Sequence, residues 1–199
     1  MTAINVSFFN SVGADSIGRG TLAVPDLAHL IRVREAAASK ASAPWLKLAT
    51  FGDLRSEKGS LRHDDNVREV SGVELDYDGE AMGVDDAIAR LEAARVECIV
   101  YTSPSHSTAK PRWRVLAPLS VARAGDAAEL REYRGRMLAR MNGVLGGVAS
   151  TESWTLSQAY YYGRVVGRDP DGSEHAPRIG RGGAAEPAGQ DRAAAFGGD

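Results

Sequence analysis

The chain has 199 residues, of which 43% are hydrophobic and 25% are charged. This length and balance fit one globular domain with appendages, or at most two small domains. A formal net charge of −2 excludes a globally basic nucleic-acid coat protein, so any nucleic-acid binding requires a local basic patch.

The single cysteine, Cys98, excludes a disulfide framework and a cysteine zinc site. It lies in the apolar run ECIVY, where we expect it to pack as a small hydrophobic side chain. The N-terminal residues lack the basic region and long apolar stretch of a signal peptide. No window approaches the ~18 apolar residues of a membrane helix. We therefore expect a cytoplasmic protein with no membrane association.

The first quarter of the chain predicts a strand, a helix and a second strand. Residues 4–9 (INVSFF) favour a strand, and the Gly-, Ser- and Asp-rich residues 10–20 favour a loop. A helix begins at Val24-Pro25-Asp26 and runs to about residue 38, because apolar residues recur there at helical spacing. After a break at residues 39–44, the alternating sequence WLKLATF predicts one strand over residues 45–51.

Residues 52–68 are polar and charged and predict a long loop or hairpin. Its cations either face a phosphate group or are simply solvated; they are Arg55, Lys58, Arg62 and His63.

The rest of the chain alternates strands with helices. We expect strands over residues 70–79, 98–102, 112–119 and 160–166, and helices over residues 85–94 and 124–143. This order favours an α/β (α+β) fold with a mixed sheet covered by helices. Residues 168–199 are dense in Gly, Pro, Ala and charge, and predict a disordered tail or interdomain linker after a domain over residues 1–167.

Two aspartates at the end of the strand over residues 70–79 (VSGVELDYDG) are the first candidate site. Asp76 and Asp78 are two residues apart, so in a strand they project from the same face, with Tyr77 on the other. Adjacent carboxylates repel each other unless a cation lies between them, and a hard divalent cation is the usual partner. The alternative is a solvated acidic turn.

Three further polar groups lie at strand ends or in adjoining loops. The first is His106 in the loop SPSHS, between Ser103 and Ser105. The second is the cationic run Lys110, Arg112 and Arg114, and the third is Glu152 with the following Gln158, the tyrosines YYY and Arg164. Each also has a plain structural interpretation: an exposed histidine, the solvent face of an edge strand, a residue near a helix N-terminus, and tyrosines in core packing.

These residue types nevertheless suit one reaction. Three carboxylates can hold one or two Mg²⁺ or Mn²⁺ ions, and the histidine, serines and cations can bind a triphosphate. Metal-assisted displacement at phosphorus requires both groups.

The motifs VELDYDG, YTSPSHS, KPRWRVLAPLS and ESWTLSQAYYYGR, in this order, resemble the archaeo-eukaryotic primase superfamily. The resemblance is to the primase-polymerase domains of phages, prophages and plasmids, and it covers about residues 4–167. It implies an RRM-like catalytic core joined to an N-terminal α/β unit. It also implies a DNA primase-polymerase that joins nucleoside triphosphates to a 3′-hydroxyl on a single-stranded DNA template.

The resemblance assigns roles to individual residues. Asp76 and Asp78 match the family's metal-binding pair, His106 matches the histidine that contacts the nucleotide phosphates, and Glu152 takes the place of the third acidic residue. Nucleotide contacts are then expected from Ser103, Ser105, Lys110, Arg112 and Arg114, and template contacts from Gln158, Arg164, the loop cations, and Trp113 or Tyr160 if exposed. Two positions depart from the family pattern, because Pro104 replaces a small hydroxyl residue and Ser150-Thr151 precede Glu152 without a hydrophobic residue. The chain has no GxxxxGK[ST] motif, the mark of the C-terminal helicase domain common in the family. The alternatives are a helicase domain missing from this chain, a helicase subunit in trans, or a standalone primase.

Other functions are compatible with parts of the sequence. A non-catalytic single-stranded nucleic-acid-binding module would keep the fold without the activity. A replication-initiator nicking enzyme would use Tyr160, Tyr161 or Tyr162 as the nucleophile, but the four histidines are scattered and form no closely spaced metal-binding pair. A DxD glycosyltransferase would account for the two aspartates alone, without the SPSHS loop or the RWR strand.

Overall fold

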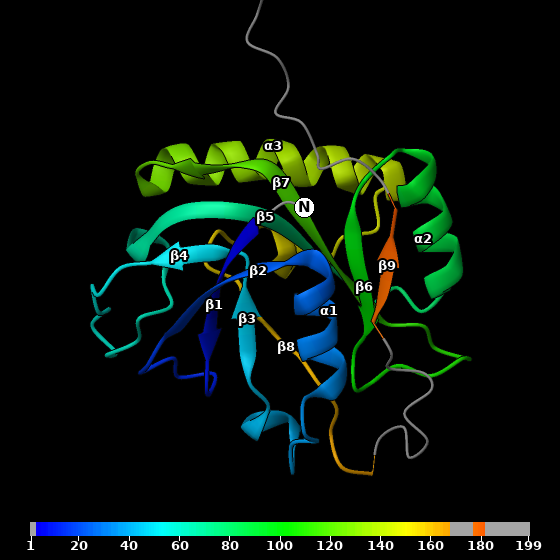
Figure 1. The fold of residues 1–199 in the computed structure, drawn as a ribbon, viewed down its shortest axis with the longest axis horizontal. Helices are drawn as coiled ribbons and strands as arrows, with labels where there is room; N and C mark the ends of the chain where they lie inside the picture. Colours follow the sequence, from blue (N-terminus) through cyan, green and yellow to red (C-terminus); the bar gives the residue numbers. More distant parts are fainter. Residues whose placement is uncertain (1–2, 168–176, 182–199) are drawn as a thin grey trace, which may run out of the picture.

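The structure, a computed structural model, describes residues 3–167 and 177–181, which form two antiparallel β-sheets and three α-helices (Figure 1). The four-stranded sheet has the order β2-β1-β3-β8, with β1 (Ala3–Phe9), β2 (Gly18–Ala23), β3 (Trp45–Lys47) and β8 (Tyr160–Tyr161). The five-stranded sheet has the order β4-β5-β7-β6-β9, with β4 (Ala49–Phe51), β5 (Val67–Tyr77), β6 (Cys98–Thr102), β7 (Trp113–Ala124) and β9 (Arg178–Gly180). The helices are α1 (Val24–Val33), α2 (Val84–Ala93) and α3 (Ala127–Leu145).

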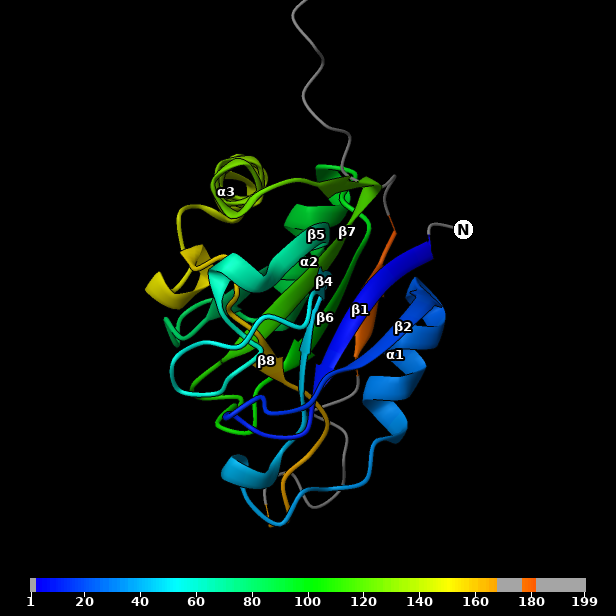
Figure 2. The ribbon, with the colours of Figure 1, turned by 90° about the vertical axis from the view of Figure 1, so that its left-hand side faces the viewer.

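The five-stranded sheet is covered on both faces. Odd-numbered residues of β5, such as Val73 and Leu75, pack with Leu91 of α2 and Leu138 of α3. Leu116 of β7 and Ile99 of β6 face the other way, into a second core with the four-stranded sheet and α1. Figure 2 shows α3 end-on, on the opposite side of the strands from α1. Beyond the register shift between Val70 and Gly72, even-numbered residues of β5 such as Glu74 and Asp76 therefore lie between the two sheets.

The fold class expected from the sequence, α+β with helices over the sheet, is confirmed. The mixture of parallel and antiparallel strand pairs is not found, because all the pairs between strands of the two described sheets are antiparallel. The longest helix, α3, begins where Asp126 and Glu129 form a capping box and ends at Gly146, whose φ of 91° is left-handed.

The run WLKLATF is two strands rather than the one expected. Residues Trp45–Lys47 pair with β1 in one sheet, and Ala49–Phe51 pair with β5 in the other. Leu48, fully buried between them, donates its N–H to Glu74 Oε1 at 2.6 Å and accepts from the Ser71 N–H at 3.0 Å. The chain thus crosses from one sheet to the other at this residue.

Several boundaries differ from expectation. The loop after β1 ends sooner, because Gly18–Ala23 pair with β1 as β2, and α1 ends at Val33 rather than near residue 38. The last tyrosine-rich strand is limited to Tyr160–Tyr161. Most of the tail expected over residues 168–199 lies outside the described residues, but Arg178–Gly180 form β9 against β6.

Among the residues that the structure describes, none of the helices combines the length and hydropathy that a membrane span requires.

Candidate functional site

The end of β5 places Asp76 and Asp78 on the face that meets the second sheet. Tyr77 points the other way and stacks on Trp113, with ring centroids 4.5 Å apart. The Tyr77 hydroxyl accepts hydrogen bonds from the N–H groups of Ala81 and Met82, at 2.8 and 2.6 Å. The strand alternation expected from the sequence is therefore present, and Tyr77 also fixes the turn that follows the two aspartates.

Both aspartates line a small pocket where the ends of the two sheets meet. Its volume is about 180 Å³. We call it the carboxylate pocket; its lining residues are Lys40, Trp45, Asp76, Asp78, Ser103, Ser105, Arg112, Arg114, Glu152, Gln158, Tyr160 and Tyr161. Nine of these twelve are residues that the sequence singled out for metal, nucleotide or template binding.

Asp76 is paired inside the protein with Arg114, its register partner on β7. Arg114 Nε lies 2.6 Å from Asp76 Oδ1, and its Nη1 donates to the Tyr161 carbonyl at 2.9 Å. The guanidinium also stacks on the rings of Tyr160 and Tyr161, at 5.0 and 4.1 Å from their centroids. Because Arg114 is only 5% exposed, it is held rigidly and neutralises Asp76 rather than reaching solvent.

The three carboxylates of the pocket influence one another. Burial raises the pKa of Asp76, Arg114 opposes this, and the negative charges of Asp78 and Glu152 raise it further. Asp78 differs, because its side chain is 52% exposed and Arg112 Nη1 is 3.8 Å away. Asp78 is therefore open to solvent and ligands, and Glu152 is exposed as well.

Glu152 reaches the pocket from η3 (Thr151–Trp154), which lies against β5. The Ser150 N–H donates to the Asp76 carbonyl at 2.9 Å, and the Asp76 N–H donates to Ser153 Oγ at 3.0 Å. These two bonds attach the segment that carries Glu152 to the strand that carries Asp76. Asp76, Asp78 and Glu152 thus line one shared pocket, while their role as metal ligands stays a prediction.

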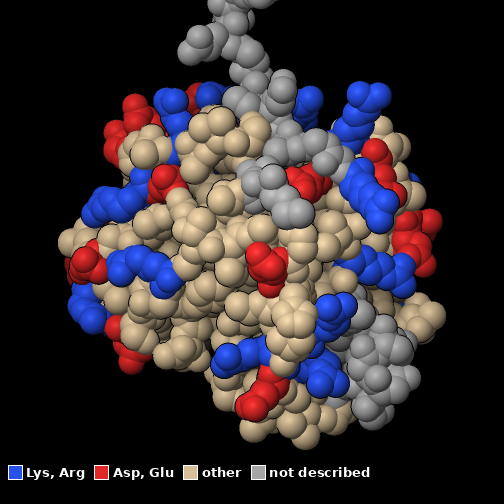
Figure 3. Space-filling view, viewed as in Figure 1, with Lys and Arg blue, Asp and Glu red and all other residues tan. Residues whose placement is uncertain are grey.

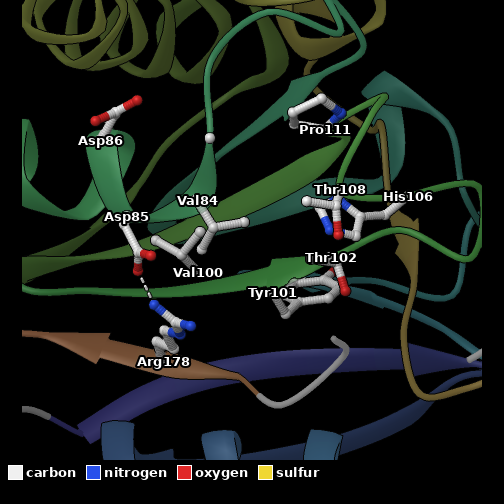
Figure 4. Close-up of a pocket in the computed structure, with 11 residues that line it drawn as sticks. Val84, Asp85, Asp86, Val100, Tyr101, Thr102, His106, Thr108, Pro111 and Arg178 are labelled. Atoms are coloured by element: carbon white, nitrogen blue, oxygen red, sulfur yellow. Dashed lines mark hydrogen bonds and ion pairs between the residues drawn. The ribbon is translucent and has the colours of Figure 1, made fainter. Parts of the chain in front are cut away.

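His106 does not line the carboxylate pocket. It lines a neighbouring cavity of about 480 Å³, together with Val84 and Asp85 at the start of α2, Tyr101 at the end of β6, and Arg178 (Figure 4). Its Nδ1 accepts a hydrogen bond from the Arg112 N–H at 3.1 Å, whereas the neighbouring Ser103 and Ser105 line the carboxylate pocket. In Figure 4, Asp85 and Arg178 form an ion pair on the far side of this cavity.

The cations after the SPSHS loop are partly engaged by Glu80, a residue that the sequence reasoning missed. Arg112 donates to Glu80 Oε1 through Nε at 3.1 Å and also through Nη2. Lys110 Nζ lies 3.2 Å from Glu80 Oε2, and Lys110 does not line the carboxylate pocket. Hydrogen bonding from Arg112 lowers the pKa of Glu80. Glu80 has φ of 58°, and no pattern in the sequence indicated this turn.

Only some of the residues expected to bind template lie at the carboxylate pocket. Gln158 lines the carboxylate pocket, whereas Arg164 lies outside it, where its carbonyl accepts from the Ala37 N–H at 2.8 Å. Trp113 and Tyr160 are 0% and 3% exposed, so neither can stack on a base in this conformation. The exposure on which that expectation depended is not found, because both rings pack in the interior.

The four-stranded sheet and its adjoining turn contribute pocket residues that the sequence did not reveal. Lys40, in η1 (Lys40–Ser42), lies 5.3 Å from the centroid of the Tyr161 ring and donates to Ser105 Oγ at 3.4 Å. Trp45 of β3 and Tyr161 of β8 pack edge to face at 5.7 Å. Lys40 lies in a short polar break with no motif, so only the tertiary structure reveals it.

By donor chemistry, the pocket fits a divalent cation, because three carboxylates supply hard oxygen ligands and two of them raise the pKa of the third. By spacing, no three His, Cys, Asp or Glu residues within the described ranges form a group that could hold a metal ion. The Arg114 guanidinium already occupies one oxygen of Asp76.

Charges elsewhere on the described surface are mixed. On the face in Figure 3, Lys and Arg side chains are interspersed with Asp and Glu. In the loop after β4, Arg55 donates to the carbonyls of Gly59 and Asp15, and Arg62 stacks over Trp45 at 5.2 Å. These two cations are therefore held by the protein itself, and the Trp45 ring that Arg62 covers lines the carboxylate pocket.

No family model matches the sequence, and no curated protein sequence matches it. Among solved structures, the chain is similar to the AEP domain of the primase-polymerase (PrimPol) of cyanophage S-2L. The TM-score is 0.47 and the sequence identity 11%, and the superposition covers 93% of this chain and 85% of that chain. We assign function from the chemistry of the site, because a fold alone does not define it.

Proposed function

We propose that this protein is a nucleotidyltransferase of the primase-polymerase kind, which forms a phosphodiester bond on a single-stranded DNA template. The observation that carries the proposal is the carboxylate pocket. It brings together Asp76 and Asp78 from one strand and Glu152 from a segment more than 70 positions later, and lines them with serines and arginines. Such a combination suits phosphoryl transfer, in which acidic groups and phosphate-binding groups must share one site.

The residues would act as follows. Asp76, Asp78 and Glu152 would hold Mg²⁺ or Mn²⁺, which supplies Lewis acidity toward the 3′-hydroxyl and charge neutralisation for the phosphates when bound. Ser103 and Ser105 would donate hydrogen bonds to phosphate oxygens, and Arg112 would bind them as a charged fork. The 3′-oxygen then bonds to the α-phosphorus as the bond to pyrophosphate breaks, and the hydroxyl proton leaves to solvent or to a carboxylate.

Arg114 has a different role in this proposal. Since it is buried and bonded to Asp76, it would set the orientation and charge of that carboxylate rather than touch the nucleotide. His106 would reach phosphates only from the neighbouring cavity. Its proposed contact with the nucleotide phosphates therefore rests on the sequence resemblance alone. A helicase domain or subunit in trans, and use by a mobile element, remain predictions from the sequence.

A second candidate function, a non-catalytic binding module for single-stranded DNA, is favoured by one observation. Asp76 is already neutralised by Arg114, and no three carboxylates among the described residues form a group that could hold a metal ion. Such a module would bind template without metal-dependent synthesis.

Primer extension on a single-stranded template, with labelled nucleotides and either Mg²⁺ or Mn²⁺, tests the proposal. We expect template-dependent synthesis by the natural chain, and at least a 100-fold loss in Asp78→Ala, because removing one group of a phosphoryl-transfer site costs on the order of 10²–10³ in rate. The matched control is Asp15→Ala, which removes an exposed carboxylate from the loop between β1 and β2. Synthesis that survives Asp78→Ala would rule out the proposed site, and DNA binding without synthesis would favour the binding module.

A further inference from the structure

The edge of β5 near Asp76 is not covered by a strand. β4 pairs with β5 only from Val67 to Val70, while β7 continues along the other side to Tyr77. Beyond β4, the N–H and C=O of Asp76 bond instead to Ser153 and Ser150. The segment that carries Glu152 therefore takes the place of a strand along this edge.

Arg134 of α3 connects the segment that carries Glu152 to β5 through hydrogen bonds. Its Nη1 donates to the Ser153 carbonyl at 2.7 Å, and its Nη2 donates to the Glu74 carbonyl at 3.1 Å and to Glu74 Oε2 at 3.0 Å. Ser153 follows Glu152 directly, and Glu74 is two residues before Asp76. One guanidinium thus connects the backbones beside two of the three carboxylates.

The charge of Arg134 is balanced within the core. Arg134 is 1% exposed, and Glu74, fully buried, pairs with both Arg134 and Lys47 of β3. The Arg134 Nε is buried without a hydrogen-bond partner among the described residues, which is unfavourable for stability. Apolar side chains of similar size often stabilise a core as well as a buried ion cluster does. What a planar guanidinium adds is fixed geometry between two carbonyl groups.

We propose that Arg134 is a positioning residue that sets the place of Glu152 relative to Asp76 and Asp78, and thereby the affinity of the carboxylate pocket for a divalent cation. The link to catalysis rests on the proposed function, whereas the effects on cation binding and on the attachment of η3 do not. Nothing in the sequence pattern of α3 sets this arginine apart from Arg131, Arg136 and Arg140; only the contacts of its buried side chain do.

The test uses Mn²⁺ binding to the full chain, measured by electron paramagnetic resonance of the free ion. Arg134→Lys keeps the positive charge but replaces the fork with one ammonium group, which cannot hold both carbonyls in the same geometry. We expect Mn²⁺ affinity to fall about tenfold, the lower end of the loss typical for residues that orient metal ligands. Arg140→Met, a change at an exposed position of the same helix, should leave it unchanged.

A double variant separates positioning from general damage. If Arg134 acts through Glu152, Arg134→Lys should change Mn²⁺ affinity less than twofold once Glu152→Gln is present, because coupled residues are non-additive. Equal losses in both backgrounds would overturn the inference, as would a natural chain that binds no Mn²⁺. Ser153→Ala, which removes the bond to the Asp76 N–H, tests the same attachment if Arg134→Lys fails to fold, and should show the same dependence on Glu152.

Hydrogen exchange gives a readout that needs neither metal nor activity. The Ser150 and Asp76 amides, bonded across the attachment, should exchange faster in Arg134→Lys and not in Arg140→Met. If the natural chain shows no synthesis but Mn²⁺ affinity depends on Arg134 through Glu152, the proposed function fails and the positioning stands. If synthesis occurs without that coupling, the positioning is overturned instead.

Discussion

The two aspartates at the end of β5 have similar sequence neighbours but different energetic roles. Asp76→Ala leaves the buried guanidinium of Arg114 without its carboxylate, and removing one partner of a buried pair costs roughly 3–5 kcal/mol. Asp78→Ala removes a half-exposed carboxylate 3.8 Å from Arg112, and should cost less than about 1 kcal/mol. We expect the two urea-unfolding free energies to differ accordingly. Equal unfolding midpoints would show that the Asp76–Arg114 pair does not stabilise the fold.

Lys47 predicts a specific pH dependence of stability. Burial, followed by the charge of Arg134, lowers its pKa to about 7, against the opposing effects of Glu74 and Asp64. In the unfolded chain it returns to 10.5, so between about pH 7 and 10.5 the unfolded state binds more protons and stability rises with pH. Below pH 7 both states are protonated and this dependence disappears.

Urea unfolding of the natural chain and of Lys47→Met, from pH 6.5 to 10, checks this. The natural chain should become more stable across that range, and the variant should lose most of the rise while Glu74 keeps its bonds to Arg134 and Leu48. A rise of the same size in Lys47→Met would assign the effect to other groups.

The sequence could predict which residues share a face of β5, because the period of a strand is two regardless of its partners. It could not predict that Arg114 pairs with Asp76, since this depends on the register between β5 and β7, which are joined by a long connection. Glu74 was overlooked for a related reason. It belongs to the same alternating series as Asp76 and Asp78, but its partners, Lys47 and Arg134, come from two other elements.

At the scale of elements, the run WLKLATF shows the limit of local patterns. Its alternation predicts a strand, and both halves are strands, but no local signal marks Leu48 as the residue where the chain changes sheet. The short strands β8 and β9 are likewise defined by pairing partners distant in sequence. Helices α2 and α3 were easier to place, because their apolar spacing and acidic N-terminal residues are local.

The crossing at Leu48 depends on a glycine in β5. A Cβ at Gly72 would lie 2.2 Å from Leu48 Cδ1, 2.8 Å from Leu48 Cβ and 2.9 Å from the Ala117 carbonyl oxygen. We expect Gly72→Ala to destabilise the protein by roughly 1–3 kcal/mol, as for other overpacked cores. Urea unfolding measures this.

Gly135→Ala is the matched control for Gly72→Ala. A Cβ at Gly135 of α3 meets nothing within 4 Å, so the change should stabilise by roughly 0.5–1 kcal/mol through helix propensity. If Gly72→Ala were as stable as the natural chain, Leu48 would have to be free to move away from β5, contrary to the packing described.

At the scale of the whole molecule, the candidate site exists only where the two sheets meet. Asp76 and Arg114 come from the five-stranded sheet, Trp45 and Tyr161 from the four-stranded sheet, and Glu152 from η3 between α3 and β8. The sequence placed several of these residues at strand ends, but no local pattern indicates that two separate sheets close around them. Pocket residues without a motif, such as Lys40, could be identified only after the sheets were in place.

The contacts between the sheets also predict how the molecule unfolds. The buried Ser7 Oγ donates to the Ala49 carbonyl at 2.7 Å, Ser71 Oγ donates to the Asn5 carbonyl at 2.5 Å, and Lys47 pairs with Glu74. Residues of both sheets also share one apolar core. Because breaking either sheet would leave these buried groups without partners, the two should unfold as one cooperative unit.

Tryptophan reporters can follow each sheet separately. With Trp154→Phe as background, Trp113→Phe leaves Trp45 of the four-stranded sheet as the reporter, and Trp45→Phe leaves Trp113 of the five-stranded sheet. In each variant, the urea midpoint from fluorescence should coincide with that from far-ultraviolet circular dichroism of the same protein, because one transition carries both signals. If Trp45 reported unfolding at lower urea than circular dichroism, the four-stranded sheet would be a separately unfolding unit. The carboxylate pocket would then open before the five-stranded sheet is lost, and synthesis would fail at urea concentrations where most of the secondary structure remains.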